Sequence, residues 1–130
     1  MSKPQIEFTP TSCSKTSTPS PFKQETTPDL TTQPLSHDPT TGDSTLLLTH
    51  HPGSEWGDPI CIHPYHEEVL ILSGRLYDKS LGKWFGPGSY CCRPPGMEHG
   101  PYAADEKEGC TEICWLRYPR LDEKVAKAVK

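Results

Sequence analysis

The 130-residue sequence predicts an all-β domain that closes as a sandwich or barrel, and three observations support this. From Leu30 onward, short apolar runs alternate with turns rich in Gly, Pro and Asp, which is typical of many short strands. The segment at 110–118 alternates apolar and polar residues along its length, as a half-buried strand does. A helical pattern is nearly absent before 121–130, where Ala, Lys and Glu favour a short helix.

The first 21 residues predict a disordered tail. They are dominated by Ser, Thr and Pro, and such a composition cannot bury enough apolar surface to offset the entropy of ordering the chain. The stretch PQIEFTP at 4–10 could still add a short edge strand. We therefore expect a tail at 1–21, a barrel at 22–120 and a short C-terminal helix or tail at 121–130.

Turn-forming residues divide the barrel segment into a series of expected strands. The sequence DPTTGD at 38–43 suits a hairpin loop because Asp, Pro and Gly favour tight turns. Pro64 should end a short strand, and the PPG sequence at 94–96 should interrupt a later one. We expect extended segments at 30–37, 44–50, 60–63, 67–77, 84–85, 89–93, 97–102 and 110–118.

Composition excludes some classes of partner. The net charge of −4 is spread over interspersed acidic and basic residues, so no basic stripe is present to bind nucleic acid. No apolar run approaches the roughly 20 residues of a membrane helix, and no targeting signal follows Met1. We expect a cytoplasmic protein. The adjacent Cys91 and Cys92 argue against a disulfide framework, so most of the six cysteines are expected to be buried thiols.

Polar residues that could bind a metal precede the strongest apolar run, in the sequence HPYHEEVLILSG at 63–74. Side chains alternate along a strand, so Cys61 and His63 should share one face, and Glu67, Val69 and Ile71 should share one face of the next strand. Whether these two faces are continuous depends on the corner at 64–65. His66 could join His63 if that corner curls.

Two spaced patterns in the same region resemble the motifs of the cupin superfamily. The first motif is His-x-His, three or four residues, Glu, six residues and Gly, and it places Cys61, His63, Glu67 and Gly74, with Cys61 replacing the first histidine. The second motif ends in Pro-x-Gly-x-x-His, and it places His99. The phrases HEEVLILSGRLYD and RPPGMEHGP, with the DPTTGD hairpin, are most similar to cupins of zinc-binding anti-sigma factors and of iron-dependent dioxygenases that cleave hydroxyaryl ketones.

This resemblance implies a small double-stranded β-helix that holds one divalent metal ion. The ligands implied are Cys61, His63, Glu67 and His99, and His66 is a further candidate. Two imidazoles and a carboxylate suit Fe(II) and also bind Zn(II), while a thiolate would favour Zn(II). Each candidate ligand also has an ordinary structural interpretation: the histidines could be hydrogen-bonded residues at strand ends, Glu67 a solvated carboxylate and Cys61 a buried thiol.

The predicted function is that of a metal-dependent enzyme acting on a small keto or enol substrate, with Glu67 and His99 as catalytic residues. With Fe(II) the reaction would be dioxygenolytic carbon–carbon cleavage. With a redox-silent metal it would be isomerisation, decarboxylation or dehydration. A non-catalytic metal- or ligand-binding module is the main rival, and a degenerate site without metal is a third hypothesis. We also expect a homodimer, because the small core leaves one sheet to be covered.

Overall fold

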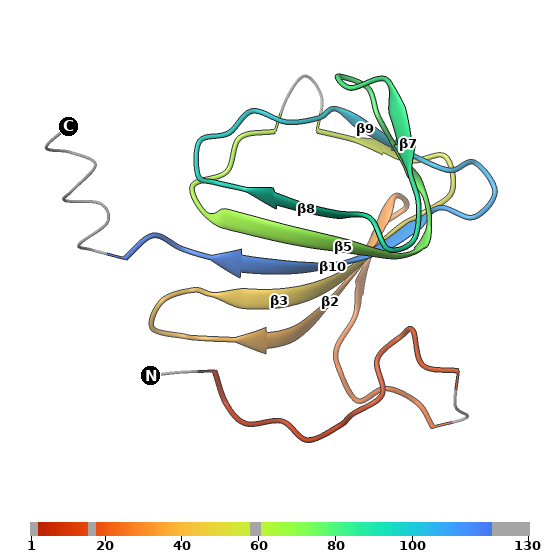
Figure 1. Cartoon of the computed structure of the whole chain (residues 1–130). Helices are drawn as coiled ribbons and strands as arrows, with labels where there is room; N and C mark the ends of the chain where they lie inside the picture. The colour runs from red at the N-terminus through yellow and green to blue at the C-terminus, as the bar shows by residue number, and fades with distance from the viewer. Residues whose placement is uncertain (1–2, 16–17, 58–60, 121–130) are drawn as a thin grey trace, which may run out of the picture.

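The computed structural model describes residues 3–15, 18–57 and 61–120, which form two antiparallel sheets (Figure 1). The six-stranded sheet has the order β1 (Glu25–Thr26), β2 (Leu30–His37), β3 (Ser44–His50), β10 (Cys110–Arg117), β5 (His66–Gly74) and β8 (Tyr90–Arg93). The four-stranded sheet has the order β4 (Glu55–Trp56), β9 (Tyr102–Ala104), β6 (Leu76–Asp78) and β7 (Lys83–Phe85). The described residues contain no helix, so the all-β prediction is confirmed.

Strand β10 lies at the centre of the larger sheet, between β3 and β5. Its residue Cys114 pairs with Leu46 on one side and with Val69 on the other. Cys110, Glu112 and Cys114 are buried, while the residues between them are more exposed. The predicted alternation in this segment is therefore real, and it places Glu112 on the inner face of the sheet.

The strand expected at 67–77 is divided between the two sheets. Strand β5 ends at Gly74 in the larger sheet, and β6 begins at Leu76 in the smaller one. Gly74 has a φ of 68°, and a Cβ atom there would lie 2.1 Å from the carbonyl oxygen of Gly109. Only glycine adopts this conformation readily and allows this close approach.

The two predicted motifs meet through backbone pairing outside the named strands. The amide of Cys61 donates to the carbonyl of His99 at 2.7 Å, and the amide of His99 donates back at 3.1 Å. In place of the strands expected at 60–63 and 97–102, the described residues form this isolated bridge, and β9 begins only at Tyr102. The bridge brings the candidate ligands together.

The N-terminal segment runs along the outside of the barrel (Figure 1). Residues 3–15 contain no strand, so the edge strand that 4–10 could have added is absent from them. The amide of Ser12 nevertheless donates to the buried side chain of Gln33 at 2.9 Å, and Lys3 donates to Thr45 at 2.8 Å. The helix expected at 121–130 falls outside the described residues.

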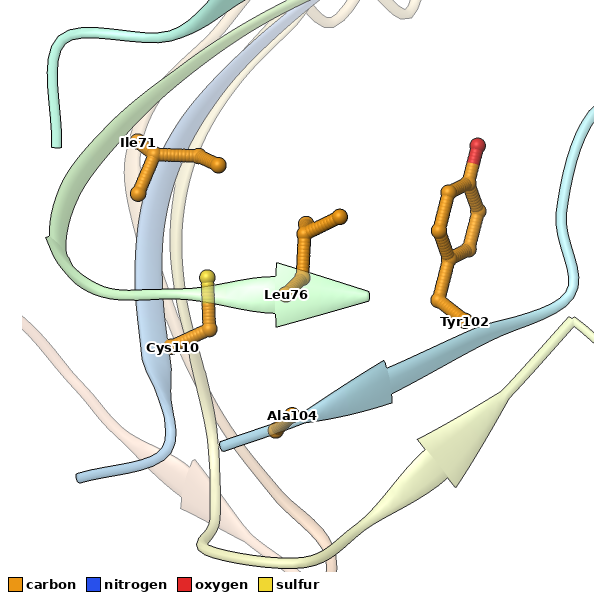
Figure 2. Close-up of a cluster of buried hydrophobic side chains, with 5 residues drawn as sticks. All are labelled: Ile71, Leu76, Tyr102, Ala104 and Cys110. Carbon is orange, nitrogen blue, oxygen red and sulfur yellow. The ribbon is translucent and has the colours of Figure 1, made fainter. Parts of the chain in front are cut away.

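The apolar core lies between the two sheets, and the candidate ligand Cys61 packs against it. Figure 2 shows its buried members, which come from both sheets: Ile71, Leu76, Tyr102, Ala104 and Cys110. All six cysteines are free, but only Cys110 and Cys114 are fully buried, so the expectation that most are buried was too broad. No helix in the described part of the chain has the length and apolar character that crossing a membrane requires.

Candidate metal centre

Three side chains from the two motifs converge at one point. The potential ligand atoms of Cys61, His63 and His99 all lie within 4.8 Å of one another. The rings of the two histidines have centroids 5.0 Å apart and are tilted by 50°. One thiol and two imidazoles at this spacing form a donor set that suits a zinc ion.

Local structure explains this convergence. Cys61 and His63 are two residues apart in an extended segment, so their side chains leave it on the same side. The turn at 94–96 is held against this segment, because the amide of Gly96 donates to the carbonyl of His63 at 3.0 Å. His99 then pairs with Cys61 through the backbone and faces the other two side chains.

Tyr102 fixes the orientation of the His99 ring. Its hydroxyl group lies 2.9 Å from Nδ1 of His99, which leaves Nε2 as the nitrogen that can bind a metal. Burial lowers the pKa of His99 to about 4, and the nearby positive charge of Arg93 acts in the same direction. The imidazole is therefore neutral at pH 7, which is the form that binds metals.

Glu67 lies beside the cluster but outside the group of three. Its Oε2 atom is 3.5 Å from Nε2 of His63, and its Oε1 atom is 3.6 Å from Nη1 of Arg93. Burial raises the pKa of Glu67, and the charges of His63 and Arg93 oppose that effect. From this position the carboxylate can act either as a fourth ligand or as a base next to the metal.

The remaining candidates differ in their surroundings. Burial raises the pKa of the Cys61 thiol, so metal binding would have to supply the driving force for its deprotonation. His66 neighbours Glu67 on β5 and faces away from the cluster, where it lines a different cavity with Lys3 and Trp115. The structure thus brings Cys61, His63 and His99 together, with Glu67 adjacent and His66 apart.

The cluster opens onto a cavity of about 390 Å³ inside the barrel. A neighbouring cavity of about 250 Å³ shares Trp56, Glu67 and Glu112 with it. Sequence reasoning missed three other polar residues that line the larger cavity, His50, Ser54 and Glu112. One signal was available for Glu112, because the alternation of β10 places a carboxylate on the same face as two buried cysteines.

Comparison with known proteins identifies the fold. A family model described as the ChrR cupin-like domain matches residues 16–116. No curated protein sequence matches the chain. The solved structures of three similar proteins are each under 25% identical to the chain, so they support the fold alone.

These three structures come from different kinds of protein. The acetylacetone dioxygenase of Acinetobacter johnsonii is 17% identical with a TM-score of 0.59, and the match covers 92% of this chain and 87% of that one. The polyketide cyclase RemF of Streptomyces resistomycificus is 20% identical with a TM-score of 0.59, over 78% and 77% of the two chains. A complex of Rhodobacter sphaeroides SigE with the anti-sigma ChrR matches at 21% identity and a TM-score of 0.55, over 72% of this chain and only 48% of that one.

Proposed function

Because the chain belongs to the family of ChrR cupin-like domains, we propose that it is a metal-dependent enzyme that binds a small keto or enol compound inside its barrel. The observation that carries this proposal is the convergence of Cys61, His63 and His99 at the wall of an internal cavity. Cavities of this size accept small organic molecules.

The donor set favours a redox-silent metal. A thiolate and two imidazoles bind Zn(II) well, whereas Fe(II) oxygenases use two imidazoles and a carboxylate. Bound at this point, zinc would act as a Lewis acid that polarises a keto oxygen of the substrate. The reaction class we infer is therefore proton transfer next to a carbonyl group, as in isomerisation, decarboxylation or dehydration.

Glu67 is placed to move the proton. Its carboxylate is held between His63 and Arg93 at the edge of the cluster, and it lines both internal cavities. In the step we propose, the C–H bond next to the carbonyl breaks, its electron pair forms the enolate, and the proton passes to Glu67. His99 would serve as a ligand whose ring Tyr102 orients.

Hydrogen exchange tests this function without knowledge of the natural substrate. The zinc-loaded protein should accelerate deuterium incorporation next to the carbonyl of hydroxyacetone in D2O, as followed by proton NMR. Glu67→Gln should lower this rate at least about 100-fold, which is the usual contribution of a general base. Glu68→Gln is the matched control, because Glu68 lies on the opposite face of β5, where its carboxylate accepts a hydrogen bond from the hydroxyl of Tyr90. Equal rates in the Glu67 variant and the wild type would contradict the role of Glu67.

A binding module without catalysis is the second candidate, and the family match favours it specifically. The structure that includes ChrR is a complex of an anti-sigma factor with a sigma factor. In that case, the zinc-loaded protein should bind metal and small ketones without accelerating exchange. Oxygen consumption by the iron-loaded protein with a diketone would instead support the dioxygenase reaction.

A further inference from the structure

A second polar group lines the same cavity as the metal centre but comes from other strands. At the end of β3, Nε2 of His50 lies 2.9 Å from Oε1 of Glu112 on β10. Both side chains are buried, at 6% and 8% exposure. The ring of Trp56 stacks on the His50 ring at 3.7 Å and almost parallel to it, so the imidazole is held in one orientation.

Ser54 adds a hydroxyl group whose hydrogen-bonding capacity is unused. Its side chain lies in the wall of the same cavity, and its Oγ atom is buried with no hydrogen-bond partner among the described residues. Its backbone is fixed, because its amide donates to His51 at 3.0 Å and its carbonyl accepts from Ala104 at 2.8 Å. Buried hydroxyl groups are almost always paired, and this one has almost no accessible surface in its present rotamer, so a ligand in the cavity would pair with it after a turn about χ1 of Ser54.

We propose that His50, Ser54 and Glu112 form a second subsite, which binds a hydroxyl group of the substrate while its keto oxygen lies at the metal centre. This inference rests on the proposed function. A hydroxyl group matches the subsite because it can donate to the carboxylate of Glu112 and accept from the hydroxyl of Ser54. A substrate carboxylate does not match it, because it would face the carboxylates of Glu112 and Glu67, which both line the cavity.

The rest of the cavity defines the size and polarity of the molecule between the two subsites. Leu46, Leu48 and Leu116 contribute apolar wall, and Trp56 and Tyr65 contribute aromatic wall. A volume of about 390 Å³ is near the lower end of the range for ligand pockets, which is about 300–1,000 Å³. The substrate class is therefore an uncharged hydroxy ketone with one ring or a short chain.

Two pyranones that differ by one hydroxyl group test this subsite directly. Allomaltol and kojic acid both present a hydroxy ketone to a metal, but kojic acid has a hydroxymethyl group where allomaltol has a methyl group. Their affinities for the zinc-loaded protein would be measured by calorimetry. Kojic acid should bind about tenfold more tightly than allomaltol, which is the usual effect of a hydrogen bond to a buried polar group.

Ser54→Ala should remove most of this tenfold preference, because one hydrogen bond contributes about fivefold to affinity. Ser89→Ala is the matched control, since Ser89 lines the neighbouring cavity and its loss should leave the tenfold preference intact. The Ser54 variant should also unfold at the same temperature as the wild type or higher, because it loses a hydroxyl group that no described residue satisfies.

Three outcomes would overturn the subsite. They are equal affinities of the two pyranones for the wild type, a preference that survives in Ser54→Ala, and a lower unfolding temperature in that variant, which would give the hydroxyl a structural role. Binding of allomaltol separates this inference from the proposed function. If allomaltol binds without any preference for kojic acid, only the subsite is wrong, whereas if allomaltol does not bind at all, the metal centre fails and the subsite fails with it.

Discussion

Tyr102→Phe should weaken zinc binding although Tyr102 is not itself a ligand. When Nε2 of His99 binds the metal, Nδ1 carries the hydrogen and donates it to the Tyr102 hydroxyl, which lies 2.9 Å away. The variant keeps the ring but leaves that buried N–H group without its acceptor. Residues that orient metal ligands in this way typically contribute about 10–100-fold to metal affinity, which corresponds to about 1.4–2.8 kcal/mol.

The fold should survive the same change. Tyr102 is 3% exposed and its ring packs 5.5 Å from the Trp56 ring, a contact that phenylalanine preserves. The free energy of unfolding without metal should therefore fall by only about 1 kcal/mol, the usual net effect of one hydrogen bond.

Competition with a chromogenic chelator would measure zinc affinity in the wild type and in two variants. Tyr77→Phe is the matched control, because the Tyr77 ring packs edge-on against Trp84 in the same sheet, away from the cluster. That variant should bind zinc as the wild type does. Unchanged zinc affinity in Tyr102→Phe, with the fold intact, would refute the assignment of Nε2 as the ligand atom of His99.

Three further predictions concern stability and assembly. Gly74→Ala should lower the free energy of unfolding in urea by about 1–3 kcal/mol or more, because φ is 68° and the new Cβ would lie 2.1 Å from the carbonyl oxygen of Gly109. A loss of less than about 1 kcal/mol would contradict the close approach of the two sheets. The pKa of Asp105 is lowered to about 2, first by a hydrogen bond from the backbone amide of Glu108 and then by one from the side chain of Arg75. The ionised carboxylate therefore stabilises the fold fully above the unfolded pKa of about 3.9, and this stabilisation is lost as the pH falls toward 2. Asp105→Asn should therefore melt below the wild type at pH 7, and this gap should close in acid; a gap independent of pH would count against the ionic contribution. We expect a homodimer that covers the outer face of the larger sheet, where Trp115 is exposed, so Trp115→Glu should give a monomer mass by light scattering, and a monomeric wild type would rule this out.

The sequence predicted the parts of the fold that depend on local patterns. The hairpin of β2 and β3 matches its expected bounds, because turn residues and apolar runs mark both strands. The alternation in β10 predicted which of its side chains face inward. The resemblance to the cupin motifs implied that Cys61, His63 and His99 lie together, and the structure brings them together with Glu67 adjacent.

Features that depend on distant contacts were not predictable in the same way. The apolar run at 67–77 gives no local sign that Gly74 turns the chain into the other sheet, since the reason is the approach of Gly109. The pairing of His50 with Glu112 joins residues that are 62 positions apart. The position of His66 depended on the corner at 64–65, and the regular alternation of β5 sends its side chain outward.

X-ray absorption at the zinc edge tests the central claim most directly, because it counts the sulfur atoms bound to the metal. The protein loaded with one equivalent of zinc should show one sulfur at about 2.3 Å and nitrogen or oxygen atoms at about 2.0–2.1 Å. Cys61→Ser should remove the sulfur, whereas Cys91→Ser should leave it in place. A zinc ion without sulfur in the wild type, or a protein that retains no stoichiometric zinc, would contradict the metal centre that Cys61, His63 and His99 are proposed to form.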